Sequence, residues 1–186
     1  MSNWSEDQAS LCESIADLNK KYAKSSCDET SAVSPESIIS ALNEFQECVR
    51  YLNTRRSTGA VLNLQSEADV QDAVYLMLRP WISDLISENP TGKVANRYSI
   101  KDFISASART VIEIKFVRDS SHGKSISKEM HDDIEVYRHH YRCRTIVFFV
   151  YDPDSLIPDH QNLKNQIEEE RVYAGKPLQC ILIIKP

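Results

Sequence analysis

The first third of the chain alternates polar breaks with stretches whose apolar residues recur every three or four positions. This spacing holds over residues 11–18 and again over residues 38–52, and it is typical of amphipathic helices. Ser34 and Pro35 open the second stretch with a cap residue before a proline, which is a common start of a helix. The pattern predicts a helical hairpin over residues 1–60. Its apolar stripe must pack either on the rest of this chain or on a second copy of it.

From residue 61 onward, stretches with helical spacing alternate with short extended stretches. The run at 145–152 has six consecutive apolar or aromatic residues, as in a strand that is buried on both faces. The predicted elements, in chain order, are a helix at 66–86 that Pro80 ends or kinks, extended runs at 94–100, 102–107 and 110–117, a loop at 119–127, a helix at 128–141, the strand at 145–152, a helix at 162–174 and a strand at 179–185. This order predicts an α/β domain over residues 61–186, in which helices flank a mixed sheet.

The composition allows one sizeable hydrophobic core. The chain has 186 residues, of which 41% are hydrophobic, and this is enough for one core with a smaller helical appendage. It begins with a polar, acidic stretch and has no run of about 18 apolar residues, so neither a signal peptide nor a membrane span is expected. These features predict a cytoplasmic protein without membrane contact.

The cysteines and histidines form no recognisable metal or disulfide pattern. The five cysteines are an odd number, with no CxxC pair and no histidine at ligand spacing. We therefore expect reduced thiols rather than a disulfide framework or a zinc site. The histidines show no ligand pairing either, and we expect all of them on the surface: His122, His131, His139, His140 and His160.

The charge narrows the classes of nucleic-acid-binding protein that fit. A net charge of -5 argues against a protein that coats nucleic acid without specificity, because such proteins carry a basic surface. It does not exclude an enzyme that holds DNA at one place. Basic residues gather at 137–144 without an acid among them. This cluster is typical of a solvated helix end, with a track for phosphates as the alternative.

Two charged residues interrupt the apolar run at 110–117. Because side chains alternate along a strand, Glu113 and Lys115 share one face, opposite the isoleucines. Charges on a buried strand are costly unless they are paired or bound to a metal ion. An edge strand with a simple Glu-Lys pair is one explanation. The other is a metal site, completed by Asp102 across a hairpin.

The metal site has a chemical rationale of its own. Two carboxylates and a backbone carbonyl supply the hard oxygen ligands that Mg²⁺ prefers, together with several waters. A lysine beside them can orient an attacking water or help to deprotonate it, and can offset the charge of a phosphate. Metal-assisted phosphodiester hydrolysis needs these parts together.

Five segments occur in an order that resembles a known group of nucleases. They are Glu67–Asp72 (EADVQD), Arg97–Phe103 (RYSIKDF), Val111–Lys115 (VIEIK), Asp133–Tyr137 (DIEVY) and Phe148–Pro153 (FFVYDP). Asp102, Glu113 and Lys115 fit the D-x(n)-E-x-K motif of the PD-(D/E)xK nuclease superfamily, and the segments together resemble its DpnII/MboI-like nuclease domains. The chain departs from the usual motif at Lys101, where a proline commonly precedes the aspartate, and the spacing from Arg97 to Asp102 is slightly long.

The resemblance implies a restriction-endonuclease-like αβββαβ core and a Mg²⁺-dependent endonuclease that cuts DNA, with Mn²⁺ able to replace Mg²⁺. It implies Asp102 and Glu113 as metal ligands, together with the carbonyl of Ile114. Lys115 would assist the attacking water. Glu67 would be a further ligand through water, although an acid in the first turn also favours the helix itself. The implied supporting residues are Gln71, Asp133 and Tyr137, and the implied phosphate contacts are Arg97, Arg118, Lys124, Lys128 and Arg138. For Asp133 and Tyr137, the alternative role is a hydrogen bond that stabilises the fold.

By the same resemblance, the domain would act in restriction or antiphage defence. The hairpin at 1–60 would then serve as a dimer contact or as a docking site for a regulatory partner protein. Two other functions stay open: a nuclease for RNA or single strands, which the motif does not distinguish, and a nuclease-fold protein that only binds and assembles partners. The intact set of Asp102, Glu113 and Lys115 favours an active enzyme over the assembly protein.

Overall fold

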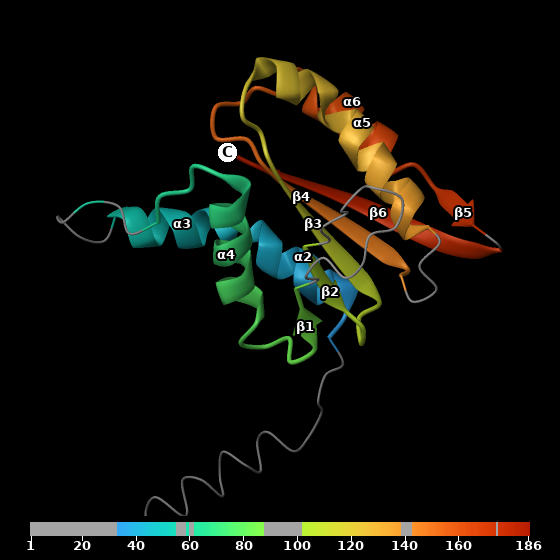
Figure 1. Cartoon of the computed structure of the whole chain (residues 1–186). Helices are drawn as coiled ribbons and strands as arrows, with labels where there is room; N and C mark the ends of the chain where they lie inside the picture. Colours follow the sequence, from blue (N-terminus) through green and yellow to red (C-terminus); the bar gives the residue numbers. More distant parts are fainter. Residues whose placement is uncertain (1–32, 55–58, 60–61, 88–101, 139–142, 174) are drawn as a thin grey trace, which may run out of the picture. The chain divides into compact units, whose positions relative to one another are not determined.

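The computed structural model describes residues 33–54, 59, 62–87, 102–138, 143–173 and 175–186 (Figure 1). The helices in these ranges are α2 (Pro35–Asn43), α3 (Phe45–Thr54), α4 (Glu67–Leu78), α5 (Ser120–Tyr137) and α6 (His160–Ile167). The strands are β1 (Leu85–Ile86), β2 (Phe103–Ser105), β3 (Thr110–Phe116), β4 (Thr145–Tyr151), β5 (Arg171–Tyr173) and β6 (Lys176–Lys185). The first helix of the expected hairpin, the run at 94–100, Arg97, His139 and His140 lie outside the described residues. None of the described helices is long and apolar enough to cross a membrane.

In the described part of the chain, six strands form one mixed sheet in the order β1-β2-β3-β4-β6-β5. Strands β3, β4 and β6 are parallel neighbours, whereas β1, β2 and β5 are added antiparallel at the two sides. Every residue of β4 is buried, in agreement with the apolar run predicted there. The predicted mixed α/β fold with flanking helices is confirmed, and it is consistent with a restriction-endonuclease-like fold.

Helices cover both faces of the sheet, with α2, α3 and α4 on one face and α5 and α6 on the other (Figure 1). The stripe of the second expected helix packs on this chain, because Ile38, Leu42 and Phe45 share a hydrophobic cluster with Ile112 and Phe149. The Phe45 and Phe149 rings meet edge to face, with 4.9 Å between their centroids. A role of residues 1–60 as a dimer contact or docking site stays a prediction.

Helix α4 ends just before Pro80, one of the two outcomes that the sequence pattern predicts. It ends at Leu78, and Pro80 follows in a turn. Proline cannot continue a helix, because its ring blocks the preceding turn and it has no N–H to donate. The prediction that Pro80 ends or kinks the helix is therefore confirmed, whereas the sequence pattern does not predict β1, in which residues 85 and 86 pair with β2.

Helix α5 begins at Ser120, so the loop predicted at 119–127 is wrong. Asp119 caps the helix, since its carboxylate accepts hydrogen bonds from two backbone N–H groups of the next turn at 2.8 and 2.9 Å. Gly123 lies against the backbone of Leu156, where an added Cβ would come within 2.4 Å of the carbonyl oxygen. The glycine that gives this segment the composition of a loop is what allows the helix to pack closely.

Helix α6 ends at Ile167, and residues 171–173 form β5 beside β6. The helix predicted over 162–174 is therefore wrong at its C-terminal end. The Arg171 guanidinium donates hydrogen bonds to the backbone carbonyls of Gln166, Ile167 and Glu169. These bonds satisfy the last carbonyls of the helix and mark its end.

Candidate active site

The β2–β3 hairpin brings Asp102 to the middle of β3. Phe103 pairs with Ile112 across the antiparallel strands, so Asp102, one residue earlier, comes opposite Glu113 and next to Ile114. Its Oδ2 accepts a hydrogen bond from the backbone N–H of Ile114 at 2.5 Å. From α4, Gln71 donates a side-chain N–H to Oδ1 of Asp102 at 2.7 Å. Groups from α4, the start of β2 and β3 therefore meet at this carboxylate.

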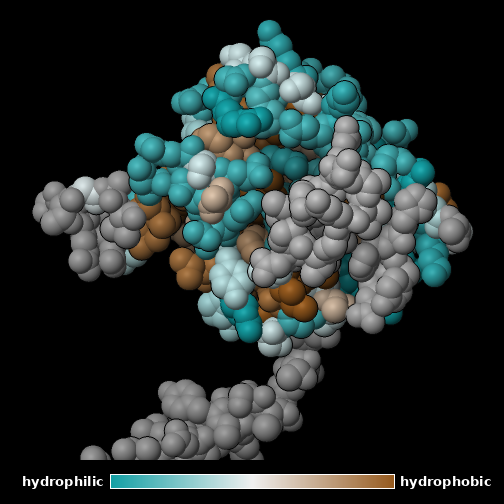
Figure 2. Space-filling view, in the orientation of Figure 1, coloured by the Kyte–Doolittle hydropathy of each residue, from teal (hydrophilic) through white to brown (hydrophobic). Residues whose placement is uncertain are grey.

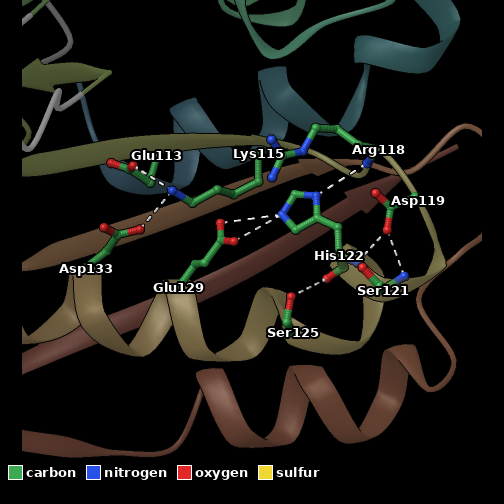
Figure 3. A network of polar contacts seen from close by, with 9 residues as sticks. All are labelled: Glu113, Lys115, Arg118, Asp119, Ser121, His122, Ser125, Glu129 and Asp133. Atoms are coloured by element: carbon green, nitrogen blue, oxygen red, sulfur yellow. Dashed lines mark hydrogen bonds and ion pairs between the residues drawn. The ribbon is translucent and has the colours of Figure 1, made fainter.

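Glu113 and Lys115 point to the face of the sheet that α5 covers. Lys115 Nζ lies 3.0 Å from Oε1 of Glu113 and 2.9 Å from Oδ2 of Asp133, which comes from α5 (Figure 3). One turn further along α5, the Tyr137 hydroxyl donates a hydrogen bond to Oε2 of Glu113 at 2.7 Å. Strand β3 lies between β2 and β4, so the explanation of the Glu-Lys pair by an edge strand is wrong.

The two carboxylates of the motif are buried close together, and this disfavours their charged forms. Asp102 is 7% exposed and Glu113 is 4% exposed. Burial, and then the charge of Glu113, raises the pKa of Asp102 to about 8. Burial likewise raises the pKa of Glu113 to about 7, although Lys115 acts in the opposite direction. Carboxyl groups with raised pKa values are common in active sites.

Lys115 keeps its positive charge in this environment. Burial alone would lower the pKa of Lys115, but the carboxylates of Glu113 and Asp133 outweigh burial and raise the pKa above its ordinary value. Burial also raises the pKa values of Asp133 and Tyr137. Lys115 is therefore a fixed ammonium donor here rather than a base.

The site offers oxygen ligands for a metal ion, although it is not a complete cage. Within the described ranges, no three histidine, cysteine or carboxylate groups converge to hold a metal by themselves. The predicted set is of another kind, because it combines Asp102 and Glu113 with the carbonyl of Ile114 and with waters, as Mg²⁺ commonly does. A divalent cation fits these groups, since its charge would favour the ionised form of Asp102, which burial and then the repulsion from Glu113 disfavour.

Glu67 lies near this site but on its exposed rim. It is in the first turn of α4, one turn before Gln71. After burial and Glu113, its charge contributes to the raised pKa of Asp102. This position serves a metal contact through water and the N-terminus of the helix equally well.

The sequence matches a known nuclease family over most of its length. The matched residues are 36–181, and the family is described as REase_DpnII-MboI. The chain belongs to the DpnII-MboI restriction endonuclease family. The resemblance that the motifs indicate is thereby confirmed, and membership in the DpnII-MboI family implies a DNA endonuclease. No curated protein and no solved structure matches the chain.

The basic residues predicted to contact phosphates lie in different settings in this DpnII-MboI family member. Arg118 is exposed just after β3, and Lys124 and Lys128 are exposed on α5. Arg138 instead pairs with a glutamate on the same helix at 2.7 Å and lies 5.4 Å from the centroid of the Tyr173 ring. The surface over α5 and α6 is hydrophilic, whereas hydrophobic residues gather over α3, α4 and β1 (Figure 2).

His122 is buried, so the prediction that all histidines lie on the surface is wrong for this residue. It is 6% exposed, and its Nδ1 accepts a hydrogen bond from the backbone N–H of Arg118 at 3.3 Å. His131 is exposed, as predicted. The sequence contains a signal for the burial of His122. Asp119 followed by two serines is a typical helix start, and a helix from that point puts His122 on the same face as Asp133.

Proposed function

We propose that this chain is a Mg²⁺-dependent endonuclease that hydrolyses phosphodiester bonds in DNA and acts in restriction or antiphage defence. The convergence of Asp102, Glu113 and Lys115 on one hairpin, in a member of the DpnII-MboI family, carries the proposal. Buried carboxylates outnumber the ammonium group beside them. Such an excess of negative charge is costly, and a bound cation would neutralise it.

The metal would be held by Asp102, Glu113 and the backbone carbonyl of Ile114, with Glu67 contributing through a water. Oxygen ligands of this kind suit Mg²⁺, and Mn²⁺ accepts them as well. The bound ion supplies positive charge to the phosphate and acidifies the attacking water. The Ile114 N–H and Gln71 orient Asp102 with one hydrogen bond to each oxygen, so that lone pairs are left for a metal.

Lys115 would donate a hydrogen bond to the attacking water or to a phosphate oxygen. Its ammonium lies 3.0 Å from Glu113 and 2.9 Å from Asp133, which fixes its direction. Because an ammonium has three N–H donors, these two contacts leave one donor for the substrate. Tyr137 holds the second oxygen of Glu113 and so keeps that carboxylate in place.

The exposed cations around α5 would bind the DNA backbone. Three of these cations are exposed to solvent, as phosphate contacts require: Arg118, Lys124 and Lys128. Arg97 and Arg138 complete the proposed set. Residues 1–60 would provide a dimer contact or dock a regulatory partner that controls the nuclease.

Cleavage of a supercoiled plasmid tests the proposal. The protein is incubated with Mg²⁺, Mn²⁺ or EDTA, and single-stranded DNA and RNA are offered in parallel. We expect the plasmid to be cut with either metal and to stay intact in EDTA. Glu113→Ala and Lys115→Ala should abolish cutting. Glu47→Ala, which removes an exposed carboxylate on α3, is the matched control and should cut normally.

Each other outcome points to a different function. Cutting that survives EDTA or the Lys115→Ala change would contradict the mechanism. A preference for RNA or for single strands would replace duplex DNA as the substrate. If neither metal supports cutting and the chain binds a partner protein tightly, the assembly role would be favoured instead.

A further inference from the structure

His122 connects the start of α5 with an acidic residue next to the site (Figure 3). Its Nδ1 accepts the N–H of Arg118 at 3.3 Å, and its Nε2 lies 3.4 Å from both carboxylate oxygens of Glu129. Because Nδ1 accepts a hydrogen bond, the proton of the neutral imidazole is on Nε2. The ring therefore donates to Glu129.

Glu129 lies one turn before Asp133 on the same face of α5. Figure 3 shows its carboxylate between the His122 ring and the pair formed by Lys115 and Asp133. After burial and Lys115, the charge of Glu129 affects the pKa of Asp133 and raises it, so the two carboxylates are close. The Glu129 side chain is 45% exposed and has room to turn.

If it turned toward the site, a carboxylate in this place would compete with Asp133 for the ammonium of Lys115. Opposite charges attract strongly where water is partly excluded. A Glu129 carboxylate without a partner would turn toward Lys115 and draw it out of the site. The hydrogen bond from His122 directs the carboxylate the other way.

We propose that His122 is a positioning residue of the nuclease site, which holds Glu129 away from the ammonium of Lys115. The ammonium then stays between Glu113 and Asp133, with its third donor directed at the substrate. This inference rests on the proposed function and extends it to a residue outside the motif. His122 acts through Glu129 and contacts neither substrate nor metal itself.

Two substitutions separate the two hydrogen bonds of the His122 ring. Glutamine places an N–H near the position of Nε2, so His122→Gln keeps the donor to Glu129 and loses the acceptor for Arg118. Asparagine reaches only the position of Nδ1, so His122→Asn keeps the acceptor and loses the donor. Glu129→Gln removes the competing charge. His131→Asn changes an exposed histidine of the same helix and is the matched control.

Steady-state cleavage of plasmid DNA with Mg²⁺ gives the first readout. His122→Asn should lower kcat about tenfold and leave KM within about twofold of wild type, because a displaced catalytic group slows the chemical step. His122→Gln and His131→Asn should turn over like the wild type. The double variant His122→Asn/Glu129→Gln should recover to within about threefold of wild type, since the competitor is gone.

A purely structural role for His122 predicts the opposite pattern. His122→Gln would then lose turnover together with stability, because the N–H of Arg118 has lost its acceptor. Glu129→Gln would also fail to rescue His122→Asn. Either result overturns the inference.

The side-chain ¹⁵N NMR signal of Lys115 gives a second readout, in the absence of DNA and metal. We expect His122→Asn to shift this signal and the double variant to restore it. An unchanged signal in His122→Asn overturns the inference whether or not the wild type cuts DNA. The expected signals in a chain that cuts no DNA would count against the proposed function alone.

Discussion

The two faces of β3 are buried to a similar degree, but they carry opposite chemistry. Ile112 and Ile114 are 0% exposed in the core beneath α2 and α4, while Glu113 between them is 4% exposed toward α5. Burying an isoleucine stabilises a fold by about 2 to 3 kcal/mol, whereas burying a carboxylate costs free energy unless it is well paired. One face therefore holds the fold together, and the other keeps charges that stability alone would not select.

The polar face of β3, which carries Glu113 and Lys115, has hydrogen-bonding partners, but carboxylates outnumber ammonium groups around it. Among the described residues, Glu113 and Asp133 contact the ammonium of Lys115, whose charge also acts on Asp102. Burial, and for Asp102 also the charge of Glu113, raises the pKa values of both carboxyl groups, although each of their oxygens accepts a hydrogen bond. This difference between two faces of one strand supports the proposal that the polar face binds a cation.

The largest effect should come from neutralising the polar face. Glu113→Gln keeps the shape of the side chain but removes the charge of a proposed metal ligand, so initial rates of plasmid cleavage with Mg²⁺ should fall by about a thousandfold. Circular dichroism should show an unchanged fold. A rate within about tenfold of wild type would mean that Glu113 is not part of the reaction.

Substitutions on the apolar face of β3 should lower stability more than activity. Ile114→Ala leaves a cavity in the core and should lower the free energy of unfolding by about 3 kcal/mol, as measured by urea denaturation. Cleavage per folded molecule should fall far less than in Glu113→Gln, because Ile114 contributes to the site only through its backbone. If folded Ile114→Ala is as inactive as Glu113→Gln, the division between the two faces fails.

The stability of the metal-free protein should depend on pH through the polar face. The folded-state pKa values of Asp102 and Glu113 are raised to about 8 and about 7. Their contribution to stability is thus complete below the ordinary carboxyl pKa of about 4, and it is lost as the pH rises through 7 and 8. Between about pH 4 and the raised pKa of each carboxyl, the free energy of unfolding should fall by up to about 1.4 kcal/mol per pH unit for each of the two groups.

Urea denaturation in EDTA at a series of pH values measures this dependence. Glu113→Gln should flatten the decline, because it removes one of the titrating groups and the repulsion on Asp102. Glu47→Gln on α3 is the surface control and should follow the wild type. Identical pH profiles for wild type and Glu113→Gln would show that the repulsion is absent.

A smaller effect on cleavage is expected from Tyr137 on α5, whose buried ring carries a hydroxyl in contact with Glu113. Tyr137→Phe keeps the buried ring but removes the hydroxyl that donates to Glu113. The Mg²⁺ concentration needed for half-maximal cleavage should rise about tenfold, as is usual when a partner of a metal ligand is lost. Tyr75→Phe, which removes a hydroxyl from α4 away from Glu113, is the control. An unchanged Mg²⁺ requirement in Tyr137→Phe would leave the hydroxyl with a role in the fold only.

The sequence pattern predicts the central elements of the sheet well and the peripheral ones poorly. Strands β3 and β4 are recognisable because burial on both faces demands a nearly continuous apolar run. Strands β1 and β5 are two and three residues long, and they exist only because β2 and β6 offer backbone partners. The N-terminal half of α5 is rich in serine, and its cap at Asp119 and the close packing of Gly123 decide its structure.

The contacts of the candidate site also differ in how well the sequence predicts them. Asp102, Glu113 and Lys115 are predictable as neighbours because one hairpin sets their register. The contacts of Asp133 with Lys115 and of Gln71 with Asp102 join helices to strands, and residue spacing does not encode them. The burial of His122 is missed because it depends on where α5 begins.

Calorimetric titration of Mg²⁺ into the metal-free protein at pH 8 tests the central claim most directly. If the polar face of β3 is a metal site, the wild type takes up Mg²⁺ and releases protons from carboxyl groups with raised pKa values. The measured heat should then change with the ionisation enthalpy of the buffer, and Glu113→Gln should show no binding under the same conditions. A wild type that binds no Mg²⁺, or a Glu113→Gln variant that binds it equally well, would contradict the account.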